Sequence, residues 1–258
     1  MIPIFVINLD RSPDRLAAVT DTFHRANLPF QRWAAIDGAC IPEPLRRYFS
    51  DQYPLTPGEV GCYASHIAIW EHMARSGMPV ALVCEDDIDV PPHLASTLAD
   101  ILAAAPTDWE VIKLSSRTHR AVHSLAQIDG HTLVRYWRVP MWTGAYLIAS
   151  AGARKLLAFQ GTRQAVDGDM ARPWLFDNLN VLGVSPPPIL QRRDTSIIAE
   201  MGGRAHRRPW RRHVRLSVNR LQRVLYNMRV LGPKNAWRCF LADQARQPQT
   251  PCSRPATL

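Results

Sequence analysis

A run of acidic residues is the clearest chemical signal in this sequence. It places four carboxylates within five positions: Glu85, Asp86, Asp87 and Asp89. The run directly follows Val80–Cys84, an apolar stretch typical of a buried strand. In open α/β sheets, ligands bind beyond the carboxyl ends of the strands. Crowded carboxylates repel one another unless a cation lies among them, and oxygen ligands favour Mg²⁺ or Mn²⁺. The run therefore predicts a divalent-cation site, with a solvated acidic turn as the alternative.

Polar residues after the first two predicted strands could bind a nucleotide. Arg11 and Arg15 follow the first strand, where planar guanidinium groups could hold a phosphate or a nucleobase edge. Asp37 ends the second strand before Gly38 and could accept hydrogen bonds from ribose hydroxyls. Each has a plainer alternative, as surface charge on a helix for the arginines and as a turn residue for Asp37. His66 falls within a predicted helix, where a histidine is more often packed than catalytic.

Strands and helices alternate along the part of the chain that carries these residues. We predict strands at about 2–9, 30–36, 80–84, 111–114, 132–137, 144–149 and 181–184, and helices at about 15–26, 57–75, 93–105 and 151–159. The start of the second helix is sharply defined, because Thr56, Pro57 and Glu59 form a capping box with proline at the first helical position. This alternation predicts an α/β sandwich with a largely parallel sheet.

Composition excludes several classes of protein. The chain has 258 residues, of which 47% are hydrophobic, so it can bury a sizeable core. The longest uncharged stretch, 139–153, is shorter than the roughly 20 residues that a membrane-spanning helix needs. The apolar start at 1–9 lacks a basic region before it, so it is a poor secretory signal. The five cysteines form no C-x-x-C pair, which favours a reducing compartment and a cytoplasmic location.

The net charge of +9 is divided unevenly. Residues 1–202 carry a balance of −3 and residues 203–258 a balance of +12. In the basic segment, apolar residues recur at helical spacing on one face of 213–231: Val214, Val218, Leu221, Val224, Leu225, Met228 and Leu231. A basic amphipathic helix suits an anionic membrane surface, with Trp210 and Trp237 as interfacial anchors. The alternative is a terminal helix that docks on the body of the protein. Arginine clusters attract any polyanion, but no RNA- or DNA-binding motif accompanies them, so nucleic acid is not expected as a partner.

Five ordered segments resemble the motifs of glycosyltransferase family 25. They are VINLDRSPDR (6–15), AAIDG (34–38), LTPGEVGCYASH (55–66), EDD (85–87) and TGAYLIA (143–149), with Val166-Asp167 after them. The resemblance covers roughly residues 2–200 and leaves the basic segment outside. It implies a GT-A type fold, a Rossmann-like nucleotide-binding sandwich, over residues 1–202, with 203–258 as a basic, mainly helical extension. It also implies inverting transfer of a sugar, galactose from UDP-galactose, to a lipooligosaccharide or other surface glycan whose lipid link would suit a membrane-associated enzyme.

The resemblance further implies roles for individual residues. Asp87 and Asp89 are expected to hold Mn²⁺ or Mg²⁺, where the metal would stabilise the leaving pyrophosphate. The expected substrate-binding residues are Asn8, Arg11, Arg15, Asp37, Ser65, His66, Glu85, Asp86, Gly144 and Tyr146. Inversion needs a carboxylate that takes the proton of the acceptor hydroxyl, and we assign this to Asp167, with Asp169 as the second candidate. Helix capping is the alternative for Asp167.

Two other functions remain open from the residues alone. A metal-dependent phosphoesterase acting on a polyanion would use the same carboxylates to activate water. A non-catalytic adaptor would use the basic segment to bind a membrane or nucleic acid, and would have no affinity for a nucleotide sugar.

Overall fold

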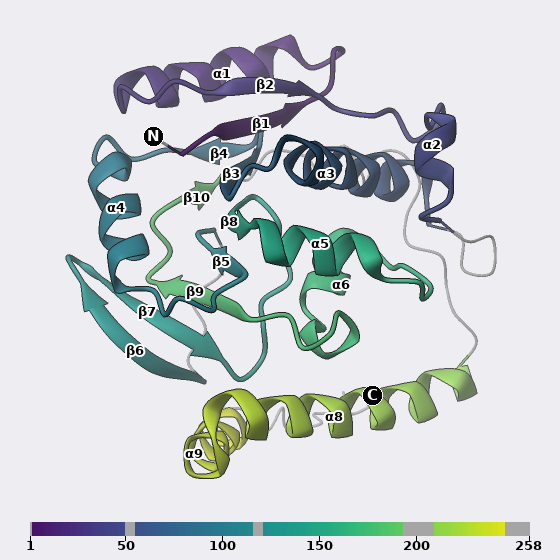
Figure 1. Cartoon of the computed structure of the whole chain (residues 1–258), viewed down its shortest axis with the longest axis vertical. Helices are drawn as coiled ribbons and strands as arrows, with labels where there is room; N and C mark the ends of the chain where they lie inside the picture. Colours follow the sequence, from purple (N-terminus) through teal and green to yellow (C-terminus); the bar gives the residue numbers. More distant parts are fainter. Residues whose placement is uncertain (1, 50–54, 116–120, 193–208, 246–258) are drawn as a thin grey trace, which may run out of the picture.

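The computed structural model describes residues 2–49, 55–115, 121–192 and 209–245, and it is an α/β structure around one large sheet (Figure 1). The strand order is β2-β1-β3-β8-β5-β9-β7-β6. The strands are β1 (Ile4–Asn8), β2 (Gln31–Ala34), β3 (Val80–Glu85), β5 (Val111–Lys113), β6 (Val122–Ile128), β7 (His131–Tyr136), β8 (Ala145–Ala149) and β9 (Val181–Ser185). Six of these eight strands run in one direction, and β7 and β8 run in the other. The predicted fold class, with its largely parallel sheet, is confirmed.

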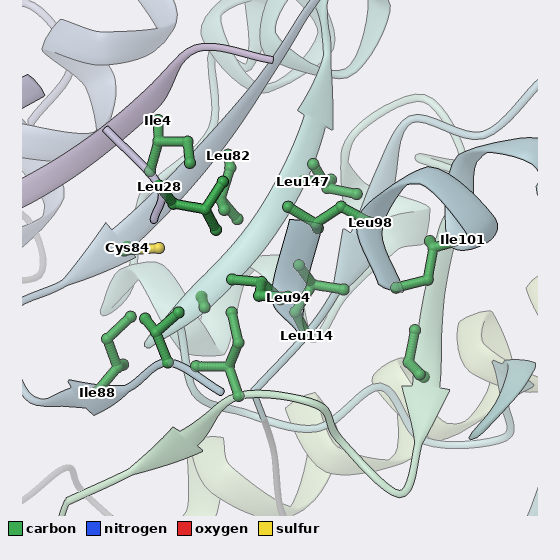
Figure 2. Packing of buried hydrophobic residues seen from close by; sticks show 14 of the residues in the cluster. Ile4, Leu28, Leu82, Cys84, Ile88, Leu94, Leu98, Ile101, Leu114 and Leu147 are labelled. Atoms are coloured by element: carbon green, nitrogen blue, oxygen red, sulfur yellow. The ribbon is translucent and has the colours of Figure 1, made fainter. Parts of the chain in front are cut away.

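Helices cover both faces of this sheet, so the central strands are mostly apolar, with polar residues at the ends of β1, β3 and β5. On one face, α1 (Pro13–Arg25) and α4 (Leu94–Ala104) pack on a cluster that includes Leu82, Leu98 and Leu147 (Figure 2). On the other face, α3 (Pro57–Ser76) and α5 (Ser150–Ala158) pack on the opposite side chains of the same strands. Every residue of β1 is buried, as a strand enclosed on both faces requires.

The start of α3 is fixed by local sequence and by a close backbone contact. The predicted capping box is present: the Thr56 hydroxyl accepts from the Glu59 amide, and the Glu59 carboxylate accepts from the Thr56 amide. Within its first turns, a Cβ on Gly61 would lie 2.5 Å from the Ile36 carbonyl oxygen and 2.6 Å from the Gly38 nitrogen. Only glycine therefore lets the helix end approach the segment that follows β2.

Short elements that sequence periodicity did not predict connect or extend this framework. They are α2 (Glu43–Arg46), α6 (Val166–Met170), the 3₁₀ helix η1 (Pro173–Leu175), and the two-stranded pair β4 (Ile88–Asp89) with β10 (Leu190–Gln191). The strand β6 and the helix α9 (Pro233–Gln244) were also missed. The β4–β10 pair matters most for function, because it brings residues about one hundred positions apart to the end of β3.

The described part of the basic segment, residues 209–245, forms α8 (Pro209–Leu231) and α9 and docks on the body (Figure 1). The Tyr226 hydroxyl donates to the Leu179 carbonyl at 2.8 Å, and the Asn227 amide donates to the Trp137 carbonyl at 3.0 Å. Arg138 pairs with Asp243 of α9 at 2.6 Å. Of the predicted apolar face, Leu231 and the partly buried Val224 pack in a cluster with Trp137 of the body, so part of that face is used for docking. Val214 and Trp210 have side chains outside the described residues.

Candidate functional site

The predicted polar residues gather in a cleft at the carboxyl ends of β1, β2 and β3. The first turns of α3 close the cleft from the side. Its polar lining includes Arg11, Arg15, Asp37, Ser65, Glu85, Asp86 and Asp87. Strand order explains this arrangement, because β1 lies between β2 and β3 and runs parallel to both.

An arginine lies between two carboxylates of the acidic run. Arg15 Nη2 is 2.8 Å from Asp86 Oδ1 and 3.2 Å from Asp87 Oδ2. Asn8, from the end of β1, donates to Asp86 Oδ2 at 2.7 Å. Gln191 of β10 donates to Asp87 Oδ2 at 2.9 Å. Asp86 is therefore held by two side chains, which fixes it in the cleft wall.

Asp87 has the electrostatic environment that suits a cation ligand. Burial, followed by the charges of Glu85 and Asp86, raises the pKa of Asp87 to about 7. Its Oδ1 is buried and has no hydrogen-bond partner among the described residues, and the same is true of Gln191 Oε1. Crowded carboxylates with an unpartnered oxygen fit a divalent cation, since oxygen donors match Mg²⁺ and Mn²⁺.

Asp89 is not brought to this cleft. Its side chain is 51% exposed and lies 3.3 Å from Arg192 Nη1. The reason is the β4–β10 pairing, which takes the chain away from the end of β3 directly after Asp87. Arg192 also donates to the Asp86 carbonyl at 2.7 Å, so it contacts both the backbone of the acidic run and the Asp89 side chain.

At the outer end of the cleft, Arg11 pairs with Asp37 at 2.6 Å. The Ala39 amide and then the Arg11 guanidinium hold the pKa of Asp37 below its usual value. Both side chains are substantially exposed, so they can exchange this contact for one with a ligand. The nucleotide-binding roles predicted for them stay predictions.

The predicted substrate ligands on α3, Ser65 and His66, are both buried, and Ser65 also lines the cleft. The Ser65 hydroxyl donates to the Gly61 carbonyl at 2.7 Å and accepts from the Ile36 amide at 2.8 Å. His66 is fully buried, with Nδ1 2.8 Å from the Tyr146 hydroxyl, which also accepts from Trp70 at 3.1 Å. These contacts orient all three side chains, and the substrate-binding roles predicted for Ser65, His66 and Tyr146 stay predictions.

His66 Nε2 points toward the acidic run. It lies 3.8 Å from Glu85 Oε1 and has no hydrogen-bond partner among the described residues. With Cys62 it completes a group of three potential ligands whose donor atoms lie within 4.8 Å of one another. Burial and the charge of Glu85 raise the pKa of the Cys62 thiol well above its usual value, so the thiol is neutral and a poor ligand for a hard cation.

Gly144 has a backbone role. Its carbonyl accepts from the Glu85 amide at 2.8 Å, and a Cβ there would lie 2.8 Å from Ser115 Oγ and 3.1 Å from Gln191 Oε1. Glycine at this position therefore allows β3, β8 and β10 to meet behind the acidic run.

The two candidate bases differ in environment. Asp169 is fully buried, pairs with Arg172, and accepts from the Tyr63 hydroxyl at 2.9 Å and the Gln164 amide at 3.1 Å. Asp167 is only partly buried, and its Oδ1 accepts from the Gly168 amide at 2.7 Å. Of the two carboxylates, Asp167 is the more exposed, and the role of base predicted for it stays a prediction.

Lys113 is a site residue that sequence reasoning missed. It is fully buried in β5, and its ammonium donates to the Pro140 carbonyl at 2.8 Å and to the Trp142 carbonyl. Burial lowers its pKa to about 8, while the nearby charges of Asp167 and Glu85 act in the opposite direction. Lys113 is thus the electrostatic neighbour of both the acidic run and the candidate base. The available signal was a lysine within an apolar strand.

Comparison with known proteins identifies the family. The model of glycosyltransferase family 25 (LPS biosynthesis protein) matches residues 1–170. A glycosyltransferase 25 family member of Aedes aegypti is 30% identical over 188 residues, which is 68% of this chain and 31% of that protein. Inactive glycosyltransferase 25 family member 3 of Homo sapiens is also 30% identical, over 67% of this chain and 31% of its own length. Procollagen galactosyltransferase 1-B of Xenopus laevis is 27% identical over the same shares.

The share of each relative that is matched, and the similarity to a solved structure, are both small. The chain spans about a third of the length of these curated relatives. A solved glycosyltransferase involved in the glycosylation of the major capsid of PBCV-1 matches with a TM-score of 0.38 at 9% identity, over 77% of this chain and 96% of that one. The family match alone covers well over half of the sequence, with the cleft residues inside it. The chain belongs to glycosyltransferase family 25.

Proposed function

We propose that this protein is an inverting glycosyltransferase that moves galactose from a nucleoside diphosphate sugar, UDP-galactose, to a glycan acceptor. The observation that carries the proposal is the cleft that gathers two arginines, Asp37 and three carboxylates at the ends of three parallel strands. Family membership supports sugar transfer, and the name of the Xenopus laevis relative supports galactose. Because another relative is named inactive, the proposal depends on the residues of this chain.

The cleft has a separate place for each part of such a donor. Arg11 and Asp37, at the exposed end, would bind the uridine portion through planar hydrogen bonds. Arg15, whose guanidinium already lies between Asp86 and Asp87, would meet the diphosphate. The sugar would then lie toward Glu85 and the loop that precedes β8.

Asp87 is the residue best suited to hold Mn²⁺ or Mg²⁺, with Asp86 beside it. Asp87 offers a buried, unpartnered oxygen, and Asp86 is oriented by Asn8. Asp89 would have to leave Arg192 to take part. When bound, the cation would supply positive charge to the diphosphate as it leaves.

The proton of the acceptor hydroxyl would pass to Asp167. In a direct displacement, the acceptor oxygen forms a bond to the anomeric carbon as the bond from that carbon to the diphosphate oxygen breaks. The partly exposed Asp167 carboxylate accepts the hydroxyl proton, while Asp169 stays in its buried pair with Arg172.

Release of UDP tests this proposal. With UDP-galactose, Mn²⁺ and a candidate glycan acceptor, we expect the protein to release UDP, and we expect Asp87→Ala or a chelator to abolish the release. Asp21→Asn, which changes an exposed carboxylate on α1, is the matched control and should retain full activity. Activity that persists in Asp87→Ala with chelator present would contradict the metal assignment. Phosphate release from a phosphoester without a sugar acceptor would favour the phosphoesterase, and absence of any affinity for nucleotide sugars would favour the adaptor.

We also propose that the C-terminal helices hold the enzyme at the inner face of an anionic membrane, where a lipid-linked acceptor would be found. Val218, Leu221, Leu225 and Met228 form an exposed apolar row on α8, whereas Leu231 of the same predicted face is buried against the body. Trp237 of α9 is also exposed. The strong positive charge of residues 203–258 complements anionic lipid and would oppose pairing with a second copy. Among the described residues, no helix is long and apolar enough to span a bilayer.

Vesicle flotation tests this location. Leu221→Gln together with Leu225→Gln should reduce binding to vesicles that contain phosphatidylglycerol, because the apolar row would lose its two most exposed leucines. Leu190→Gln is the matched control, since it removes an equally exposed leucine from the body. Removal of the whole segment would be a poorer test, because it would also uncover the surface on which Tyr226 and Asn227 dock. Equal flotation of all variants would contradict the proposal.

A further inference from the structure

The loop between β7 and β8 presents two large apolar side chains to solvent. Met141 is 43% exposed and Trp142 is 37% exposed. Among the described residues up to 192, the only other large hydrophobic side chain that is similarly exposed is Leu190, which adjoins Gln191 at the acidic run. The exposed apolar side chains of this part of the chain thus lie next in sequence to Thr143 and Gln191, which contact Glu85 and Asp87 of the acidic run, and exposed apolar patches mark binding sites.

This loop is held rigidly. Lys113, buried in β5, donates to the carbonyls of Pro140 and Trp142, so one ammonium fixes both ends of the exposed turn. Trp142 has a φ of 109°, a conformation that a bulky residue rarely adopts and that persists only where the surroundings enforce it. Thr143, the next residue, is buried and donates to Glu85. Strained backbone conformations that the surrounding structure enforces are concentrated at active sites and ligand-binding positions.

The loop connects the donor cleft to the candidate base. On one side, the Thr143 hydroxyl reaches the Glu85 carboxylate, which lines the cleft. On the other side, a Cβ built on Gly168 would lie 3.9 Å from Met141 Cε, so the methionine lies beside the residue that follows Asp167. An acceptor hydroxyl that attacks a donor sugar near Glu85 and gives its proton to Asp167 would lie between these two points, beside the exposed turn.

We propose that Trp142, with Met141 beside it, is the platform on which a pyranose ring of the acceptor stacks. One face of a pyranose is lined by C–H groups and its rim by hydroxyls, so it matches a flat indole that is apolar on its face and partly solvated. This inference rests on the proposed function, because it places the acceptor by the positions of the donor cleft and Asp167. A side chain that only covered the donor would affect donor and acceptor alike.

Kinetics with a soluble acceptor distinguish a side chain that binds the acceptor from one that only covers the donor. With lactose as the acceptor probe and no lipid present, we expect Trp142→Ala to raise the acceptor KM about tenfold, the loss expected for one stacked ring. The KM for UDP-galactose should change less than about twofold, and Trp142→Phe should restore much of the acceptor affinity. Leu241→Ala removes a large apolar side chain that is 49% exposed on α9 and should leave both constants unchanged. An unchanged acceptor KM in Trp142→Ala, or an equal rise in the donor KM, would overturn the proposal.

A binding measurement tests the platform without turnover. The indole N–H signals of ¹⁵N-labelled protein would be followed during titration with lactose, with the Trp142 signal assigned by its loss in Trp142→Phe. We expect the Trp142 signal to shift and the Trp237 signal to stay in place. If the Trp142 signal does not move, the platform is refuted, whether or not the enzyme is active. Calorimetry with UDP-galactose on the same sample reports separately on the proposed function, since failure of the donor to bind would refute that function alone.

Discussion

Replacement of Asp87 by asparagine should change stability and activity in opposite directions. In the metal-free protein, burial and the charges of Glu85 and Asp86 raise the pKa of Asp87 to about 7 from a usual value of 3.8. The folded state therefore binds this proton more tightly than the unfolded chain does. Stability is lost as the pH rises from about 4 to about 7 and stays at the lower level above that. Asparagine carries no charge, and its amide oxygen can still accept the hydrogen bond from Gln191.

The size of the effect follows from the pKa. At about 1.4 kcal/mol per pH unit, the shift sets a ceiling of about 4 kcal/mol on the cost of the charged Asp87 at pH 8. Relaxation around the side chain reduces this, so we expect Asp87→Asn to raise the free energy of unfolding by roughly 2–4 kcal/mol at pH 8. The gain should shrink steadily toward pH 5, where the wild-type carboxyl is largely protonated.

Urea denaturation in the presence of EDTA, at several pH values from 5 to 8, measures this gain. Asp89→Asn is the matched control, because its carboxylate is 51% exposed, and it should change stability by less than about 0.5 kcal/mol. Added Mn²⁺ should stabilise the wild type and not Asp87→Asn, while UDP release by the variant should be lost. A variant that is less stable than the wild type in EDTA at pH 8, or a gain that does not depend on pH, would refute the electrostatic reasoning.

Two predictions concern the support of the cleft. Tyr146→Phe would leave the buried ring nitrogens of His66 and Trp70 without their shared hydroxyl partner, so we expect a loss of about 2–4 kcal/mol in urea denaturation, and a loss below about 0.5 kcal/mol would contradict the network. Gly61→Ala would force a Cβ to within 2.5 Å of a backbone oxygen, and it should lower both the melting temperature and the affinity for UDP measured by calorimetry. Gly168→Ala meets nothing closer than 3.9 Å and should melt like the wild type, so equal melting of both alanine variants would contradict the close-contact argument.

Features that depend on local sequence were predictable. The capping box at Thr56 was correct because its hydrogen bonds join residues three positions apart, and the helix it starts runs as predicted. The acidic run was placed correctly at the end of a buried strand. Which of its carboxylates face the cleft was not predictable, because that depends on β10. Pairing of β10 with β4 turns Asp89 away and brings Gln191 to Asp87, and no short-range pattern encodes a pairing across about one hundred residues.

The basic segment shows a second limit of periodicity. Helical spacing placed Leu225 and Leu231 on one apolar face, but in the structure Leu231 is buried on the body and Leu225 is 59% exposed. A helix whose apolar residues cover a wide arc can bury some of them against the body and expose the others to solvent. Helical spacing alone does not predict which residues are buried and which are exposed. Docking on the body, one of the two alternatives posed for this segment, is therefore present in α8 together with an exposed apolar row, and binding to an anionic membrane stays a prediction.

Lys113 shows how a local conflict in sequence can point to function. A charged residue buried at the end of a central strand is costly, because the ammonium must leave water, and its pKa of about 8 records that cost. Strand propensity and hydrophobic pattern would both favour an apolar residue there, and conflicts of this kind in natural proteins concentrate at functional sites. Here the ammonium fixes the carbonyls on either side of Met141, next to the candidate base and the acidic run. The buried lysine therefore stabilises a strained loop whose exposed tryptophan, by the inference above, determines where the acceptor binds.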